Sequence, residues 1–224
     1  MRALNKKNYK LFFPGKNRKD SKQNDVIIIT GAKGVGKTTL AKYLLELYHK
    51  FNPEDRVFVF SGIKNAYDDL PFAKSIDLEE ASRIEDEKTF NDWSGVPSAD
   101  KFTNSIVLFD DYENYPHPKM NKILERLVNN LAQNGRNYSI TLIAIMHHLN
   151  KGLKSSTLLR ELDALIFFPE KFDSNVFNTL LNHFGLKKEF IIRLFNLPDK
   201  FIYLRNSYPF YYFTSSDLNP KQIK

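Results

Sequence analysis

Residues 26–50 of the chain read VIIITGAKGVGKTTLAKYLLELYHK, and this stretch decides the fold. It begins with a run of apolar β-branched residues at 26–29, which predicts a strand buried on both faces, as in a parallel sheet. A glycine-rich turn follows. From residue 39 onward leucines and tyrosines recur at helical spacing, while Lys42, Glu46 and Lys50 form the opposite polar stripe. We therefore expect a strand, a tight turn and an amphipathic helix in direct succession.

The turn at residues 31–38 matches the pattern G-x-x-x-x-G-K-[ST]. Backbone N–H groups of such a loop converge on phosphate oxygens, which bulky residues at the tight turns would prevent, and the following helix adds its positive dipole end. We predict that Lys37 reaches the β- and γ-phosphates of ATP and that the Thr38 hydroxyl binds Mg²⁺. A surface turn rich in Gly and Lys is the alternative, disfavoured by the flanking strand and helix. The predicted nucleotide-binding residues are Gly31, Ala32, Lys33, Gly34, Val35, Gly36, Lys37, Thr38 and Thr39.

A second apolar run, residues 106–109, ends in the carboxylates Asp110 and Asp111. In a parallel sheet the end of this strand lies at the same edge as the phosphate loop. We therefore predict that Asp110 belongs to the Mg²⁺ shell and that Asp111 orients or deprotonates the attacking water. Glu113 is the alternative base. Four apolar residues followed by two acids also occur at ordinary strand ends, so the pairing with the loop carries this prediction.

A further apolar run, residues 140–146, is followed by His147 and His148. The chain has no cysteine and its other histidines are scattered, so a histidine- or cysteine-ligated metal site is not expected. At the tip of a strand beside the acidic one, the His147 imidazole is placed to sense the γ-phosphate or to hold the water. A partly exposed loop histidine is the alternative, which we assign to His148.

The remaining pattern alternates strands and helices, which indicates an α/β domain with a mainly parallel sheet flanked by helices and a C-terminal β-hairpin. Residues 61–104 have no clear periodicity and are expected to form short helices and loops on the surface. The other expected strands are 57–60, 164–168 and a pair within 200–213, and the other expected helices are 120–131, 174–184 and 190–195.

The chain of 224 residues carries a net charge of +7, and its distribution is uneven. Residues 1–24 hold eight basic groups and one acid, so the rest is balanced. We expect a basic arm over 1–24, one domain over 25–215 and a short tail over 216–224. The arm suits a polyanion or an acidic patch on another subunit, and a solvated tail is the alternative. Short apolar runs and the lack of a secretory pattern favour a soluble intracellular protein.

The loop, residues 107–111 and residues 135–144 together resemble the FtsK/HerA superfamily of P-loop ATPases, with a RecA/ASCE-like fold. The compact size and the Asp-Asp pair are most similar to the packaging ATPases of double-stranded DNA viruses of the poxvirus, giant-virus and virophage kind. The resemblance implies Mg²⁺-dependent ATP hydrolysis by a ring, a pentamer or hexamer, that translocates double-stranded DNA into a capsid. It also implies a capsid or portal vertex partner, and a location in the virion or the virus factory of the host cytoplasm rather than secretion.

Two positions depart from the resemblance, since larger members have Glu where Asp111 stands and Gln where His147 stands. The family also implies that an arginine from one subunit completes its neighbour's site. We assign this role to Arg136, which precedes the strand at 140–146 and so should lie at the edge of the sheet opposite the phosphate loop. Arg160 is the alternative, and each arginine also fits an ordinary surface role.

Three other classes remain open. One is a cellular P-loop kinase, although no arginine-rich lid insert is evident. The second is an AAA+-like DNA-associated ATPase, which would normally carry an extra helical domain. The third is a nucleotide-binding structural protein with negligible turnover. ATPase activity that rises with long duplex DNA separates the motor from all three.

Overall fold

The structure is a computed structural model that describes residues 5–14, 25–77, 99–112, 118–147, 149, 153–206 and 210–223. Within these residues the strands form one sheet in the order β3-β2-β4-β5-β1-β6-β7-β8-β9. The first six strands of that order are parallel, and the last three are antiparallel. The strands are β1 (Val26–Thr30), β2 (Arg56–Ser61), β3 (Ala73–Asp77), β4 (Ser105–Asp110), β5 (Ile140–Met146), β6 (Ala164–Phe167), β7 (Ile202–Arg205), β8 (Tyr211–Thr214) and β9 (Lys221–Gln222).

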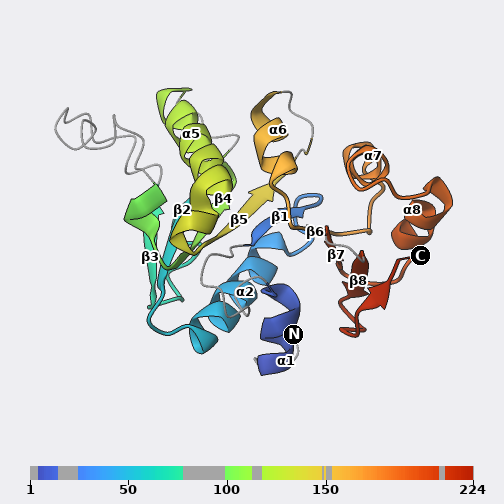
Figure 1. Cartoon of the computed structure of the whole chain (residues 1–224), viewed down its shortest axis with the longest axis horizontal. Coiled ribbons are helices and arrows are strands. Elements are labelled where there is room, and N and C mark those ends of the chain that lie inside the picture. Colours follow the sequence, from blue (N-terminus) through green and yellow to red (C-terminus); the bar gives the residue numbers. More distant parts are fainter. Residues whose placement is uncertain are drawn as a thin grey trace.

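Helices cover both faces of the sheet (Figure 1). Alternate residues of β1 enter two separate hydrophobic cores, with Ile27 on the side of α1 and α2 and Ile28 on the side of α5 to α8. Burial on both faces explains why β1 is a continuous apolar run, and it confirms the predicted α/β class. The helices are α1 (Lys6–Phe12), α2 (Lys37–Phe51), α5 (Pro118–Asn134), α6 (Leu153–Arg160), α7 (Ser174–Asn182) and α8 (Lys188–Phe195), with short 3₁₀ turns η2 (Ala99–Phe102) and η4 (Gly135–Tyr138).

The expectation of only short helices and loops over 61–104 was wrong at β3, which pairs in parallel with β2 at the edge of the sheet. Its sequence AKSID has no apolar run, because an edge strand is only partly covered and needs none. The rest of that segment from 78 to 98 lies outside the described residues. So does most of the turn expected at 206–209, of which only Asn206 is described.

The first part of the expected basic arm is a helix that packs on the domain. Asn5 caps α1 by accepting a hydrogen bond from the backbone N–H of Asn8 at 2.9 Å. Tyr9, Phe12 and Phe13 are buried among the aromatic residues of α2, β7 and β8. Their i, i+3, i+4 spacing is a helical stripe among the basic residues.

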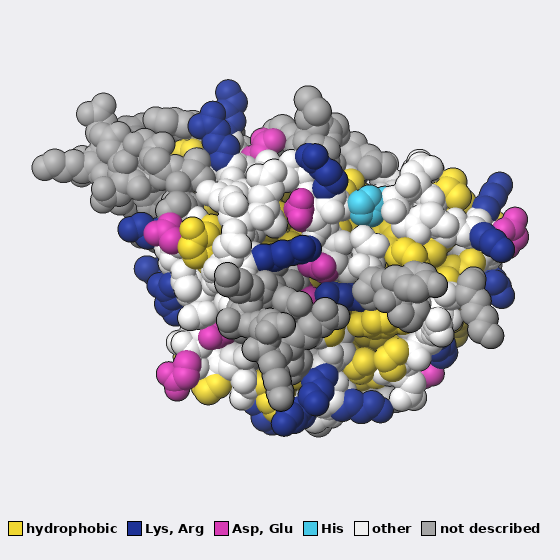
Figure 2. Space-filling model, in the orientation of Figure 1, with side chains coloured by type: hydrophobic (Ala, Val, Ile, Leu, Met, Phe, Trp, Pro, Cys, Tyr) yellow, Lys and Arg dark blue, Asp and Glu magenta, His cyan; other side chains and the backbone are white. Residues whose placement is uncertain are grey.

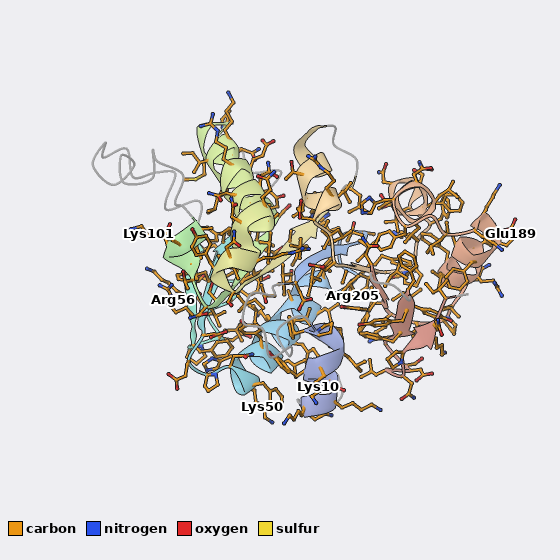
Figure 3. All side chains as sticks on the ribbon, viewed as in Figure 1. Lys10, Lys50, Arg56, Lys101, Glu189 and Arg205 are labelled. Carbon is orange, nitrogen blue, oxygen red and sulfur yellow. The ribbon has the colours of Figure 1, made fainter. Side chains whose placement is uncertain are left out.

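The charge of this segment stays on the solvent side. Lys6, Lys7 and Lys10 are exposed on α1, and Lys10 points away from the body of the protein (Figure 3). Figure 2 shows Lys and Arg side chains gathered along the rim of the molecule over α1 and α2. At the other end of the chain, β9 extends the sheet and Leu218 is buried, so part of the expected tail also belongs to the folded unit.

A buried ion cluster joins the C-terminal hairpin to the amino ends of the central strands. Nη2 of Arg205, at the end of β7, lies 2.6 Å from Oδ1 of Asp25 and 3.8 Å from Oδ1 of Asp163 (Figure 3 labels Arg205). Asp25 precedes β1 and Asp163 precedes β6, where it also accepts a hydrogen bond from the N–H of Val26 at 2.9 Å. Since removing one partner of a buried pair leaves an uncompensated charge, this cluster secures the hairpin against the sheet.

The packing of α1 gives a stability prediction. Phe12→Ala removes a ring that is 1% exposed and contacts four other aromatic rings, so we expect it to lower the free energy of unfolding by about 3–5 kcal/mol. Urea unfolding followed by circular dichroism measures this difference. Lys10→Ala, on the exposed face of the same helix, is the control and should change stability by less than about 0.5 kcal/mol. Equal stability of the two variants would contradict the packing of α1.

Candidate active site at the carboxyl edge of the sheet

A cavity of about 910 Å³ opens at the carboxyl ends of the parallel strands. One wall is the predicted phosphate loop, and the opposite wall is the strand end with Asp110 and Asp111. His147 lies between them, because β5 is inserted between β1 and β4 in the sheet. The segment from Phe168 to Val176, which follows β6 and begins α7, contributes the remaining side. The structure thus brings the predicted loop, acids and histidine together around one space.

The conformation of the loop depends on its glycines. Gly36 is the N-cap residue of α2 with φ of 101°, and no side chain caps the helix there. The amino end of α2 therefore directs its first N–H groups and its dipole toward the cavity. Gly31 has φ of 153°, and a Cβ at this position would lie 3.1 Å from Cβ of Phe168. Both positions consequently require glycine.

Lys37 is buried and turns back over the loop. Its Nζ donates hydrogen bonds to the carbonyl oxygens of Gly31 and Ala32, each at 2.8 Å. Burial lowers the pKa of Lys37, an effect opposed by the nearby carboxylates of Asp110 and Asp111. A desolvated ammonium held by two carbonyls is well prepared to exchange them for phosphate oxygens.

Asp110 is 2% exposed and carries two hydrogen bonds on one oxygen. Its Oδ2 accepts from the Thr38 hydroxyl at 3.2 Å and from the Tyr67 hydroxyl at 2.7 Å. Burial raises the pKa of Asp110, and the two hydrogen bonds oppose that shift. A hydroxyl and a carboxylate side by side are hard oxygen ligands of the kind Mg²⁺ takes from protein beside phosphate. The residues present therefore fit the predicted metal position.

Asp111 and His147 form a second polar pair in the cavity. Nε2 of His147 lies 3.4 Å from Oδ1 of Asp111, and both side chains are about one third exposed, 27% and 34% respectively. Asp111 adopts a left-handed conformation with φ of 57°, which is uncommon for a residue other than glycine and concentrates at functional sites. The turn aims this carboxylate into the cavity instead of continuing β4.

The two arginines lie elsewhere. Arg136 is exposed in η4, directly before β5, and is therefore at the amino edge of the sheet, opposite the cavity. Arg160 is exposed at the end of α6, directly before β6. No arginine among the described residues lines the cavity. Glu113 and His148, the alternatives for the base and the sensor, lie outside the described residues.

Sequence reasoning missed Tyr67, which contacts Asp110, and the cavity-lining residues that follow β2 and β6, namely Ile63, Phe168, Lys171, Phe172, Asp173, Ser174, Asn175 and Val176. Tyr67 comes from the connection between β2 and β3, a segment without a recognisable motif. Lys171 and Phe172 follow β6, and Phe172 is 66% exposed although it is aromatic. The sheet order, which places the end of β6 beside β1, brings Lys171 and Phe172 to the cavity, and the pairing of β2 with β4 brings Tyr67 to Asp110. An aromatic residue next to a lysine after a strand end was the one available signal.

A second cavity, of about 720 Å³, adjoins the phosphate loop on its other side. Gly36, Thr39 and Phe168 line both cavities. The second cavity is otherwise largely aromatic and apolar, with a polar rim. Its remaining lining residues are Phe12, Val35, Leu40, Tyr43, Pro198, Asp199, Lys200, Phe201, Ser215, Ser216 and Leu218.

The mainly parallel sheet and the loop after β1 form the architecture of P-loop NTPases, and solved structures share this architecture. The genome packaging NTPase B204 of Sulfolobus turreted icosahedral virus 2, solved in complex with AMPPCP, matches with a TM-score of 0.51 and 12% identity over 90% of this chain and 97% of that one. The type VII secretion ATPase EccC of Thermomonospora curvata matches with a TM-score of 0.55 and 16% identity over 84% of this chain and 25% of that one. The expected likeness to packaging ATPases is confirmed at the level of the fold.

A sequence relative is also found. An uncharacterized protein, V3, of the Sputnik virophage is 27% identical over 191 residues, which cover 84% of this chain and 74% of that protein. No family model matches the chain. Within the described residues, no helix is long and apolar enough to cross a membrane.

The geometry of Lys37 gives a binding prediction. Lys37→Ala removes the buried cation from the loop, and because hydrogen bonds to charged groups contribute about 1.5–3 kcal/mol, it should weaken tripolyphosphate binding at least roughly tenfold. Isothermal titration calorimetry measures the affinity. Lys42→Ala, one turn further along α2 and paired with Asp69, serves as the control and should bind like the wild type. If Lys37→Ala bound tripolyphosphate with wild-type affinity, the loop would not be the phosphate site.

Proposed function

We propose that this protein is a Mg²⁺-dependent ATPase that drives double-stranded DNA into a viral capsid. The observation that carries the proposal is the convergence of three groups on one cavity: the Lys37 ammonium, the Thr38–Asp110 pair and the Asp111–His147 pair. Each corresponds to one requirement of phosphoryl transfer, namely phosphate binding, metal binding and orientation of the nucleophile. The shared fold with a genome packaging NTPase supports the packaging role.

The chain's own residues divide the work. The loop N–H groups and Lys37 bind the phosphates, while Thr38 and Asp110 would hold Mg²⁺, which supplies neutralisation of charge on the β- and γ-phosphates. Asp111 faces the cavity from the neighbouring strand end and accepts a proton from the attacking water. His147, 3.4 Å from Asp111, restricts the rotation of that carboxylate and senses whether a γ-phosphate is present.

The second cavity suits the base and ribose. The phosphate loop lies between the two cavities, and the metal and water-orienting residues all face the first. A nucleotide bound along the loop with its γ-phosphate in the first cavity therefore directs its base toward the second. Aromatic side chains such as Phe12, Tyr43 and Phe201 provide apolar surface for a planar base. In this arrangement α1 forms part of the nucleotide site.

The function is tested by hydrolysis with and without DNA. We expect ATP hydrolysis that requires Mg²⁺ and rises with long duplex DNA, measured as phosphate release. Asp111→Asn tests the proposed base, because the amide preserves the shape of the side chain and removes its basic oxygen. This variant should bind ATP like the wild type and hydrolyse it at least about a hundredfold more slowly. A hydrolysis rate that does not change with duplex DNA would contradict the packaging motor and favour a kinase or another P-loop ATPase. If Asp111→Asn hydrolysed ATP at the wild-type rate, Glu113 would be the base instead.

The proposed partners follow from the packaging role. They are double-stranded DNA, further copies of this chain in a ring, and a capsid or portal vertex protein, in the virion or the virus factory. The exposed lysines of α1 are a surface for DNA or for an acidic region of such a partner. These assignments rest on the fold shared with packaging ATPases and on the charge of α1.

We also propose that Arg136 acts on the site of a neighbouring subunit. No described arginine lines the cavity, and Arg136 is exposed at the opposite edge of the sheet, from where it cannot reach its own phosphates. In a ring this edge can face the next subunit's cavity. An arginine supplied in this way contributes about 10³–10⁵ in rate by neutralising charge on the transferring phosphoryl group.

Mixing of variants tests this role. Arg136→Ala subunits alone should bind ATP and fail to hydrolyse it. Mixed with Lys37→Ala subunits, which keep the arginine and lack a working loop, they should regain part of the activity. Wherever the loop of an Arg136→Ala subunit faces the arginine of a Lys37→Ala subunit, the site is complete, whereas the reverse contact stays inactive. Mixtures with Arg160→Ala test the alternative in parallel. Absence of recovery at every ratio, with mixed assembly confirmed by native mass spectrometry, excludes Arg136 from the mechanism.

A further inference from the structure

Tyr67 lies in the connection between β2 and β3 and is 1% exposed. Its hydroxyl donates a hydrogen bond of 2.7 Å to Oδ2 of Asp110. The same oxygen accepts the longer hydrogen bond, 3.2 Å, from Thr38. A tyrosine from a segment without a motif thus makes the shorter of the two contacts to the carboxylate at the predicted metal position.

The surrounding contacts hold this tyrosine in place. Lys42 on α2 lies 2.7 Å from Asp69 and has its Nζ 5.7 Å from the centre of the Tyr67 ring, which joins the connection to the helix that follows the phosphate loop. At its start, the connection donates the N–H of Gly62 to the carbonyl oxygen of Asp110 at 3.1 Å. Backbone and side chain of Asp110 are therefore both held by the same segment, in which the Tyr67 ring is buried.

In this arrangement the two carboxylate oxygens of Asp110 have different roles. Hydrogen bonds to Oδ2 restrict rotation of the carboxylate and leave Oδ1 available to a cation. The Thr38 hydroxyl has to present a lone pair to the same cation, so its contact with Asp110 changes when the cation binds. The phenol of Tyr67, which also interacts with the Thr38 hydroxyl, is not needed as a ligand of the cation and remains a donor to Oδ2 of Asp110.

We propose that Tyr67 is a positioning residue, whose hydroxyl holds the Asp110 carboxylate in the orientation that binds the Mg²⁺ of the nucleotide complex. The inference rests on the proposed function, since it concerns the metal that accompanies ATP. It adds to that function a residue outside the loop and the acidic strand end. Positioning of a metal ligand from the adjacent shell commonly changes metal affinity by 10–100-fold.

The chain contains a matched pair for the control. Tyr48 is fully buried, and its hydroxyl also donates to a carboxylate, Oδ2 of Asp55, at 2.7 Å. Asp55 lies before β2, at the amino edge of the sheet, so this pair is far from the cavity. Tyr48→Phe and Tyr67→Phe each remove a 2.7 Å hydrogen bond from a tyrosine to a carboxylate, together with a contact to a threonine hydroxyl (Thr141 for Tyr48 and Thr38 for Tyr67), and only the second variant changes the contacts of Asp110.

The experiment measures nucleotide affinity with the metal as the variable. The full-length chain is titrated with AMPPCP, a non-hydrolysable ATP analogue, in EDTA and then over a range of Mg²⁺ concentrations, and Mn²⁺ binding to the same complex is followed by electron paramagnetic resonance. For Tyr67→Phe we expect the affinity in EDTA to stay within about twofold of the wild type and the half-saturating Mg²⁺ and Mn²⁺ concentrations to rise about tenfold. Tyr48→Phe should show the wild-type metal dependence, and melting temperatures of both variants report any loss of stability.

A double-variant cycle identifies the path of the effect. If Tyr67 acts through Asp110, Tyr67→Phe has no further effect on metal affinity in an Asp110→Asn background. A Tyr67→Phe variant with the wild-type metal dependence, or with a change equal to that of Tyr48→Phe, overturns the inference while leaving the proposed function intact. A wild-type protein that binds no nucleotide in either condition refutes the proposed function, and the inference with it.

Discussion

The parallel pairing of β5 between β1 and β4 is the constraint on which the candidate site depends. In this register Thr30 is the partner of Met146, and Asp110 is the partner of Ile145, so the three strands end within one residue of one another. The phosphate loop, His147 and Asp110 therefore emerge at one edge although more than a hundred residues of chain separate the loop from His147. A shift by one residue would turn the side chain of Asp110 to the other face of the sheet and remove it from Thr38. The register of the sheet thus sets the relative positions of these groups.

Burial gives these groups their chemical character. Lys37 and Asp110 lie in the site with little access to water. Desolvation lowers the pKa of Lys37 and raises the pKa of Asp110, and both shifts favour the neutral form of the group. Nearby opposite charges and hydrogen bonds work against that tendency, so each charge depends on the others being present. A site of this kind gains most when a polyanion and a cation arrive together, because the charges of both then replace contacts within the protein. Asp111 and His147 are partly exposed and so are open to water, as their proposed part in orienting a nucleophile requires.

Much of the fold could be predicted from the sequence, and the reasons differ from element to element. β1, β4 and β5 are buried on both faces, so each is a continuous apolar run, and α2 and α5 carry a clear apolar stripe. β3 could not be predicted, because an edge strand with half-exposed side chains has no distinctive pattern. The helix α1 was hidden by the basic residues on its exposed face, although the spacing of Tyr9, Phe12 and Phe13 is helical. A cluster of charged residues in the sequence can therefore conceal a packed helix or strand when one of its faces is solvated and the other is buried.

For the candidate site, the sequence by itself predicted the groups whose proposed roles depend on chain neighbours. The glycines and Lys37 follow directly from the loop, since a tight turn before a helix has few sequence solutions. Asp110 and Asp111 follow from a strand end. Only the tertiary structure decided that Tyr67 contacts Asp110, that Lys171 and Phe172 border the cavity, and that α1 borders a second one. These residues come from segments without a motif, brought to the site by strand order and helix packing, which involve contacts between residues far apart in the chain. Such contacts leave no periodic signal within any one segment, so no local pattern could have revealed them.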